Sequence, residues 1–344
     1  RAKAKTGIPR PAEEVMDAMA ECAKAAAADA GVPWEKIRRI GIGVPGTANE
    51  ETGVVEYANN LLFENVPMRA YLQKKLNKEI DITNDANAAA LGEVLAGAAK
   101  GASNAVAVTL GTGVGGGIVI DGKLFTGFHY GGAELGHMGI VLGGRKCTCG
   151  RRGCLEAYAS ATGLIRSTKE AMDAAPDSLM WELAAENGGN VSGRTAFLAA
   201  DRGDTAAQSV VNAYIEQLGY GLASIINILA PEILVIGGGV SNEGENLLRP
   251  LVDCVRPQLY IRTPEKQTRI VLATLGNDAG LIGAAFFKPC PVNFVLMGGT
   301  ENDRPFEIDF SMSESGVRVY FERADERLHH LSDRRPLRHS GASV

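Results

Sequence analysis

The sequence predicts an α/β protein with two domains. Buried strands alternate with helices along most of the chain, a pattern typical of sheets that are covered by helices. With 344 residues, of which 45% are apolar, the chain is long enough to fill more than one core. Glycine turns follow several predicted strands, and such turns leave backbone amides open to ligands.

The composition limits the classes of partner that this protein is expected to bind. A net charge of −5 gives no general basic surface for nucleic acid, and no apolar run is long enough to cross a bilayer. The opening RAKAKTGIPRPAEE lacks the apolar core of a secretory signal. We therefore expect a cytoplasmic protein that acts on small molecules, without nucleic acid or membrane partners. Because the first residue is Arg1 rather than methionine, we also expect residues upstream of it.

The first third of the chain contains a helix and two strands in order. Residues 11–30 predict a helix, because alanine is abundant and apolar residues recur at helical spacing. Residues 37–46 (IRRIGIGVPG) predict a strand that runs into a glycine turn. Residues 80–83 predict a second strand, followed by a long helix with Asp85 near its start, where the positive helix end favours an acidic side chain.

A second domain begins after this helix. Residues 105–124 predict a buried strand, a glycine turn, another strand and a polar turn, and the alternation continues through residues 209–241. We expect the hinge near Lys100–Asn104 and a return to the first domain at a short helix, Asp278–Phe287. The predicted domains are residues 1–103 with 274–288, and residues 104–273.

Beyond Lys288 the sequence changes character. FEIDFSMSESGVRVYFERAD alternates around the turn SESG and predicts a hairpin with arms at Phe306–Met312 and Val317–Phe321. The last stretch is basic and is expected to be disordered. Residues 289–344 are therefore predicted to form an atypical tail.

A cluster of cysteines behind a histidine indicates a metal site. One imidazole and three thiols form a Cys3His set suited to tetrahedral zinc, and four protein ligands would close the shell around a structural ion. In a reducing compartment, clustered cysteines favour metal over disulfides, although a loop of free thiols is the alternative. The predicted ligands are His137, Cys147, Cys149 and Cys154. The other three cysteines are isolated in the sequence, and we interpret them as buried or incidental thiols: Cys22, Cys254 and Cys290.

Two glutamates bracket this loop. If a metal fixes the loop, Glu134 and Glu156 could be held at one wall of a pocket and accept hydrogen bonds from sugar hydroxyls. Glutamates are common on surfaces, so a solvated role is the alternative for each.

Two glycine loops follow buried strands and together indicate a nucleotide. LGTGVGGG, Leu110–Gly117, offers successive amides to a phosphate, and IGGGVS, Ile236–Ser241, offers bare backbone to a base or ribose. Simple hairpin turns are the alternative. Neither loop matches GxxxxGK[ST], which excludes a Walker-type phosphate loop.

The pair Asn84 and Asp85 could act on a sugar. Asp85 could take the proton of a hydroxyl that attacks a γ-phosphate, and Asn84 could orient the same sugar. Helix capping is the alternative for both residue types, and the segment alone favours it.

The motifs GIGVPG, NDANAAALGE, LGTGVGGG, ELGH, CTCGRRGCLE and LVIGGGVS occur in this order. The series resembles the ROK family of sugar kinases and repressors, and within it the bacterial glucokinases, over about residues 1 to 288. The resemblance implies an actin-like, ribonuclease-H-like fold of two domains around a cleft, with ATP and Mg²⁺ on one side and a hexose on the other. It also makes a homodimer an option.

The resemblance implies a role for each motif residue. It makes Asp85 the catalytic base, in place of the capping role. The sugar would be lined by Gly46, Asn60, Asn84, Glu134, His137 and Glu156. ATP phosphates would meet Gly111 and Thr112, and the adenosine would face Gly238 and Gly239. His137 would also ligate structural zinc, together with Cys147, Cys149 and Cys154.

The implied reaction is transfer of the γ-phosphate of Mg-ATP to the 6-hydroxyl of glucose. Alternatives are a kinase for fructose, N-acetylmannosamine or N-acetylglucosamine, a sugar-responsive repressor, and a sugar-binding protein without catalysis. Kinases of the family begin with a strand, a DxGGT phosphate loop and a hairpin, and this sequence starts after them. Residues 294–303 (FVLMGGTEND) contain a similar GGT, but Leu296 stands at the acidic position, so we interpret the match as coincidence.

Overall fold

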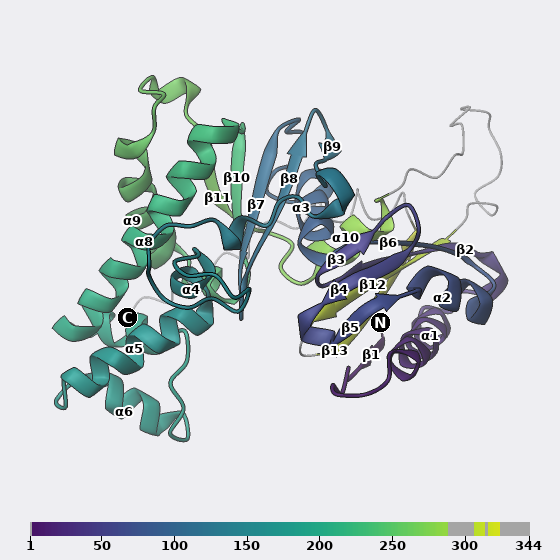
Figure 1. The fold of residues 1–344 in the computed structure, drawn as a ribbon, viewed down its shortest axis with the longest axis horizontal. Coiled ribbons are helices and arrows are strands. Elements are labelled where there is room, and N and C mark those ends of the chain that lie inside the picture. The colour runs from purple at the N-terminus through teal and green to yellow at the C-terminus, as the bar shows by residue number, and fades with distance from the viewer. Residues whose placement is uncertain (1, 288–305, 314–315, 324–344) are drawn as a thin grey trace, which may run out of the picture. The chain divides into compact units, whose positions relative to one another are not determined.

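The computed structural model describes residues 2–287 and, as backbone strands, residues 306–313 and 316–323. The GGT segment 294–303 and the basic stretch 324–344 lie outside the described residues. The chain divides into two compact units, which are labelled by their elements in Figure 1. Unit 1 comprises residues 1–85 and the chain from Ala284 onward, and unit 2 comprises Ala86–Gly283.

Unit 1 is built on a five-stranded sheet with the order β1-β13-β12-β2-β6. Its helices are α1 (Ala12–Asp29) and α2 (Met68–Leu76). The strands of the main sheet are β1 (Ala2–Ala4), β2 (Ile37–Val44), β6 (Glu79–Asn84), β12 (Phe306–Ser313) and β13 (Gly316–Arg323). A second, three-stranded sheet contains β3 (Thr47–Asn49), β4 (Val54–Ala58) and β5 (Phe63–Val66).

The predicted helix 11–30 is confirmed as α1, which starts directly after Pro11. Proline suits a helix start because its missing N–H would have no partner in the first turn. The apolar side of α1, including the fully buried Val15 and Met19, packs with the β2 side chains Ile40 and Ile42 in one core. This core fixes the position of β2, whose end carries the glycine turn.

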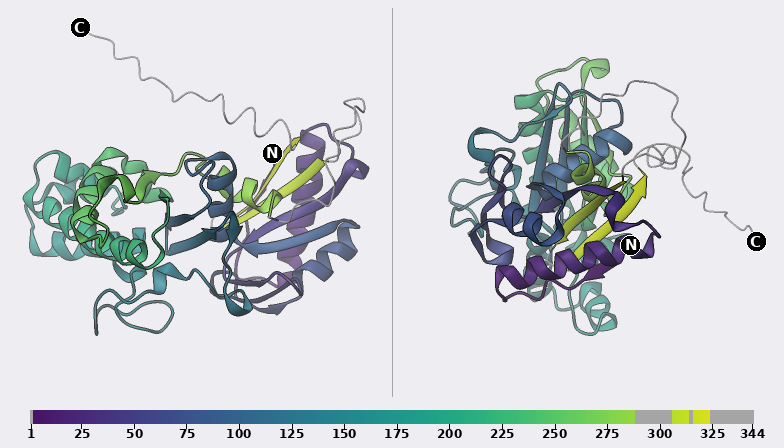
Figure 2. Two further views of the ribbon diagram at one scale, coloured as in Figure 1. Left: turned by 90° about the horizontal axis from the view of Figure 1, so that it is seen from above. Right: turned by 90° about the vertical axis from the view of Figure 1, so that its right-hand side faces the viewer.

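The hairpin β12–β13 lies inside the unit 1 sheet. Strand β12 runs parallel to β2, with Phe310 opposite Ile42, and β13 runs antiparallel to β1, with Val319 opposite Ala2. Figure 2 shows the two yellow strands among the purple strands of the amino-terminal part. The two strands pair antiparallel with each other at the residues where the hairpin was predicted, and both belong to the unit 1 sheet.

Unit 2 is built on a sheet with the order β11-β10-β7-β8-β9. Its strands are β7 (Ala105–Leu110), β8 (Val114–Ile120), β9 (Lys123–Leu124), β10 (Ile233–Gly237) and β11 (Arg269–Leu272). Its helices are α3 (Asp85–Ala96), α4 (Glu156–Ala159), α5 (Ala161–Ala174), α6 (Leu179–Glu186), α7 (Thr195–Asp201), α8 (Thr205–Leu229), α9 (Glu245–Val255) and α10 (Asp278–Ala285).

Alternation along β7 sends side chains to both faces of this sheet. Val106 and Val108 enter the larger core, where they meet apolar residues of α8 such as Leu222. Ala105 and Ala107 face the opposite side, and pack in a core that includes Ala90 of α3. The helices α3 and α8 therefore cover opposite faces, as expected for an α/β layer structure.

The boundary between the units differs from the predicted hinge at Lys100–Asn104, because it falls after Asp85 and after Gly283. Helices α3 and α10 pack backbone against backbone: a Cβ at Gly92 would lie 2.0 Å from the Ala279 carbonyl oxygen, and one at Gly283 would lie 1.7 Å from that of Ala88. Two glycines thus allow the close contact between these helices, and unit 2 contains α3 from Ala86 onward and α10 as far as Gly283.

A buried carboxylate strengthens this arrangement. Glu93 of α3 is 2% exposed and accepts hydrogen bonds from the backbone amides of Ala98, Thr274 and Leu275. The charged group is satisfied by three N–H donors, so its burial is tolerated. Among the helices of the described residues, none has the length and apolar character that a membrane crossing requires.

Candidate functional site

The two glycine loops that were predicted to bind a nucleotide lie side by side in unit 2. Strands β7 and β10 are parallel neighbours, with Thr109 opposite Gly237, and the loops leave from their carboxyl ends. A Cβ at Gly238, where φ is +85°, would lie 2.5 Å from the Leu110 carbonyl oxygen. The contact requires glycine and brings the second loop against the start of the first. Ligands of α/β sheets bind at such carboxyl edges.

The loops expose the glycines that a ligand would meet. Gly238 and Gly239 are exposed, and a Cβ at Gly239 or at Gly111 would meet no atom within 4 Å. Thr112 is also exposed, and its carbonyl accepts a hydrogen bond from the Thr162 hydroxyl at 2.8 Å. This hydrogen bond from the start of α5 thus supports the loop, and the outer side of the loop remains exposed to solvent.

The remaining glycines of LGTGVGGG have a different function. They belong to β8, where a Cβ at Gly117 would lie 2.5 Å from Ala90 Cβ and one at Gly116 would lie 2.5 Å from the Ala133 carbonyl oxygen. These glycines let α3 approach one face of β8 and the segment before Glu134 approach the other. The nucleotide prediction thus applies to residues 111–113, and the strand glycines serve close packing.

The four predicted metal ligands converge. His137 ends a short 3-10 turn (Leu135–His137), and the cysteines follow on a loop, with one potential ligand atom of each residue within 4.8 Å of the others. The Cys149 and Cys154 sulfurs are 3.7 Å apart, and His137 Nδ1 lies 3.5 Å from the Cys147 sulfur. Glycines at Gly150 (φ +87°) and Gly153 (φ +80°) form the turns that bring the sulfurs together.

These distances fit a tetrahedral zinc site. With Zn–S bonds of about 2.3 Å and Zn–N bonds of about 2.0 Å, tetrahedral angles separate two sulfurs by about 3.8 Å and a sulfur from a nitrogen by about 3.5 Å. Burial raises the pKa of the Cys147 thiol to about 12, so its thiolate form requires a nearby cation. The donor set and its spacing therefore fit zinc.

Glu156 connects the metal loop to the first glycine loop. Its Oε1 accepts hydrogen bonds from the Thr148 hydroxyl at 2.8 Å and from the Cys147 sulfur at 3.4 Å. Its Oε2 accepts from the Val114 amide at 3.2 Å, and a Cβ at Gly113 would lie 2.6 Å from the same oxygen. Thr148 was not among the residues predicted from the sequence, although its position between two predicted ligands in CTC is a signal for it.

Glu134 precedes the 3-10 turn that carries His137. Partial burial raises the pKa of the Glu134 carboxyl, the nearby His137 lowers it, and the charge of Glu156 raises it further. Glu134 is therefore within electrostatic range of both His137 and Glu156.

Unit 1 brings together a second set of predicted residues. A Cβ at Gly46 (φ +86°) would lie 2.1 Å from the Tyr57 carbonyl oxygen, so the turn after β2 requires glycine. The Asn84 side-chain amide donates to the Gly46 carbonyl at 2.9 Å, across the neighbouring ends of β2 and β6. Asp85 is the half-buried first residue of α3, and Asn60 is exposed on the 3-10 turn Asn59–Leu61.

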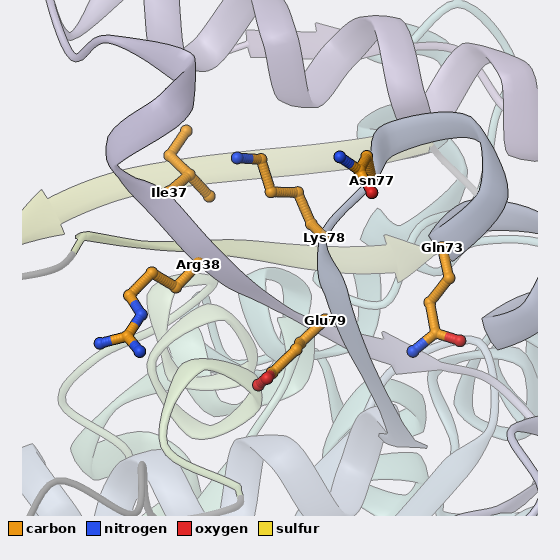
Figure 3. A pocket seen from close by; sticks show the side chains of 6 residues that line it. All are labelled: Ile37, Arg38, Gln73, Asn77, Lys78 and Glu79. Carbon is orange, nitrogen blue, oxygen red and sulfur yellow. The ribbon is translucent and has the colours of Figure 1, made fainter.

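A pocket of about 440 Å³ opens on unit 1 at the start of β2 and the end of α2. Figure 3 shows its polar lining, with Arg38 on β2 and Glu79 on the neighbouring strand β6. The Lys78 amine lies 5.4 Å from the centre of the Trp34 ring, and burial lowers the pKa of this lysine. The pocket contains none of the predicted site residues.

Comparison with known proteins identifies the family. A family model described as the ROK family matches residues 1–289. The chain belongs to the ROK family. It is 40% identical over 248 residues to a glucokinase from Halalkalibacterium halodurans, and the aligned region covers 72% of this chain and 74% of the relative. It is 41% identical over 256 residues to a glucokinase from Thermotoga maritima, which covers 73% of this chain and 79% of the relative.

The fold agrees with this assignment. A crystal structure of a ROK family glucokinase from Streptomyces griseus, in complex with glucose and AMPPNP, matches with a TM-score of 0.70 and 33% identity. The match covers 81% of this chain and 88% of that one. The ROK family fold, an actin-like α/β fold, is therefore confirmed. The hairpin β12–β13 lies beyond the residues that the family model matches.

Proposed function

We propose that this protein is an ATP-dependent hexose kinase with glucose as its substrate. The observation that carries the proposal is the placement of the two glycine loops at the carboxyl ends of β7 and β10, with Glu156 joining one of them to the metal loop. A nucleotide site and a sugar-binding carboxylate in direct contact are what phosphoryl transfer to a sugar requires. The identity of 40% or more to two glucokinases supports glucose.

In the proposed reaction, Asp85 accepts the proton of the 6-hydroxyl as its oxygen attacks the γ-phosphorus of ATP in line. The bond from the γ-phosphorus to the β–γ bridging oxygen breaks, and ADP leaves. Backbone amides at Gly111 and Thr112 would hold phosphate oxygens, and Gly238 and Gly239 would lie against the adenosine. Mg²⁺, when bound with ATP, would neutralise charge on the phosphates.

Each unit, taken by itself, contains residues that we propose for sugar recognition. In unit 1, the hydrogen bond from Asn84 to Gly46 supports a fixed strand edge beside Asp85, and Asn60 would add a polar contact. In unit 2, Glu134, His137 and Glu156 would accept or donate hydrogen bonds to the hydroxyls. Zinc held by His137 and the three cysteines would have a structural function, because four protein ligands leave no open position for water. A homodimer remains a prediction.

The test is ADP release from Mg-ATP with this chain and glucose, beside Asp85→Asn. We expect glucose-dependent turnover that falls about 10³-fold in the variant, the usual loss for a general base, while glucose binding by calorimetry is retained. Asp121→Asn is the matched control, because Asp121 is exposed in a turn of unit 2 and asparagine tolerates its φ of +50°.

Assays with other phosphate-acceptor sugars identify the preferred substrate. Fructose, N-acetylmannosamine and N-acetylglucosamine are assayed in parallel, and a higher kcat/KM with any of them would replace glucose. Sugar binding without turnover in the unaltered chain would contradict the kinase proposal and favour a sugar-binding protein.

A further inference from the structure

The Glu156 carboxylate has one oxygen on each of two loops. Oε1 accepts a hydrogen bond at 2.8 Å from the Thr148 hydroxyl of the metal loop, residues 137–154. Oε2 accepts one at 3.2 Å from the amide of Val114, the first residue of β8, directly after the nucleotide loop, residues 111–113. Hydrogen bonds to a carboxylate are stronger than those between neutral groups, so both contacts restrict the rotation of this group. The carboxylate is a physical link between the two loops.

Glu156 Oε2 can approach the Val114 amide closely because the preceding residue, Gly113, has no side chain. A Cβ at Gly113 would lie 2.6 Å from Oε2, so any larger residue would displace the carboxylate. On the other side, Cys147 also reaches Oε1, at 3.4 Å, but its sulfur is a predicted metal ligand. The Thr148 hydroxyl is the closer donor to Oε1 and is not itself one of the four ligands.

We propose that Thr148 is a positioning residue for both substrates. Its hydroxyl fixes the Glu156 carboxylate in the orientation that keeps Oε2 on the nucleotide loop and presents the group to the sugar. The inference rests on the proposed kinase function. It predicts that one exposed threonine, which contacts neither substrate in this scheme, affects the binding of glucose and of ATP together.

Thr148→Val tests this proposal, because valine keeps the shape and removes the donor. We expect KM for glucose and KM for ATP each to rise about tenfold, since the lost bond is to a charged group. Thr148→Ser restores the hydroxyl and should return both values to within about twofold of the unaltered chain. Metal content per chain, measured by mass spectrometry, should stay the same in all three proteins.

Thr162→Val is the matched comparison. The Thr162 hydroxyl also reaches the nucleotide loop, at the Thr112 carbonyl, but has no described contact with Glu156 or the metal loop. This variant should raise KM for ATP and leave KM for glucose unchanged. A parallel rise of both values in Thr162→Val would show that any disturbance of the loop has this effect, and would overturn the assignment to Thr148.

A double-mutant cycle tests the route through Glu156. Thr148→Val in a Glu156→Ala background, where no acceptor remains for the Thr148 hydroxyl, should add less than about twofold, because residues that act through one contact are not additive. Additive effects, unchanged KM values in Thr148→Val, or loss of metal from that variant would each overturn the proposal.

Failure of the kinase proposal can be distinguished from failure of the inference about Thr148. If the unaltered chain neither binds nor phosphorylates a hexose, the kinase proposal falls and this inference falls with it. If the unaltered chain phosphorylates glucose and Thr148→Val does so with the same constants, only the inference fails.

Discussion

Unit 2 and unit 1 hold their parts of the predicted site in different ways. In unit 2, the metal ligands and both glutamates come from one stretch, residues 134–156, and the glycine loops leave neighbouring parallel strands. In unit 1, Gly46 and Asn84 lie at the ends of β2 and β6, and the sheet that holds these strands includes a hairpin from beyond residue 305. Local sequence therefore determines the arrangement of the predicted residues in unit 2, whereas a distant segment supports those in unit 1.

The largest effect expected from this difference is that of removing the hairpin. A chain that ends after Lys288 would leave the inner edge of β2 and the pairing edge of β1 without their ladder partners, since β12 and β13 lie between them. We expect amide exchange in β1 and β2 to accelerate by about 100-fold or more, while β7 and β10 keep their protection. Hydrogen-exchange mass spectrometry measures both.

A chain that lacks only residues 324–344 is the control, because it keeps both hairpin strands. Unchanged protection of β2 in the shorter chain would mean that the hairpin does not pair with it in solution, and the contrast between the units would disappear.

Removal of one metal ligand should act on unit 2 alone. Cys149→Ser should abolish bound zinc and lower the melting temperature of unit 2 by about 5 °C or more, because ligand binding to the folded state contributes to its stability. Cys254→Ser, outside the cluster, should keep the metal. Zinc content and calorimetry give the result, and equal metal content in both variants would contradict the assigned ligands.

A smaller effect is expected at the junction of the glycine loops. Gly238→Ala places a Cβ against the Leu110 backbone at a φ of +85°, which should cost about 1–3 kcal/mol of unfolding free energy. Gly239→Ala, next to it, meets no atom within 4 Å and should cost less than about 0.5 kcal/mol. Denaturant unfolding compares them, and equal losses would show that the two loops do not touch as described.

The smallest effect concerns Asp204, which caps α8 in unit 2. Burial alone would raise the pKa of this carboxyl, but hydrogen bonds from the Ala207 amide, the Ser178 hydroxyl and the Leu179 amide lower it below its ordinary 3.8. The ionised form therefore stabilises the fold above pH 3.8, and this stabilisation disappears as the pH falls through the lower folded pKa.

Asp204→Ala should cost about 1–2 kcal/mol at pH 7, and the difference from the unaltered chain should narrow below pH 3.8. Urea unfolding at pH 7 and at pH 3 measures the two differences. A difference of the same size at both values would mean that the cap does not depend on the charge.

Sequence patterns predicted much of unit 2, because its signals are local. The spacing of the cysteines behind His137 predicted the cluster, and glycine turns after buried strands predicted both loops. The function of Gly116 and Gly117 was not predictable in this way, because glycines in a strand and in a ligand loop look alike until a helix is known to pack on them.

Unit 1 was less predictable. The hairpin was recognised from its alternation, but its pairing with β1 and β2 joins residues far apart in the chain, and strand partners leave no periodic signal in either segment. The observed boundary between the units, after Asp85, differs from the predicted hinge at Lys100–Asn104 for a similar reason. The contact of Gly92 with Ala279 places α3 in unit 2, and no pattern within α3 reveals its partner.

The position of β12 between β13 and β2 has a consequence for biosynthesis. Strand β2 leaves the ribosome early, but its partner β12 is translated only after all of unit 2. Unit 2 is therefore complete, and free to fold, while β1 still lacks β13 and β2, although paired with β6, still lacks β12. During that interval the nascent chain carries an unpaired strand edge, so chaperone binding and stalled translation would act first on unit 1.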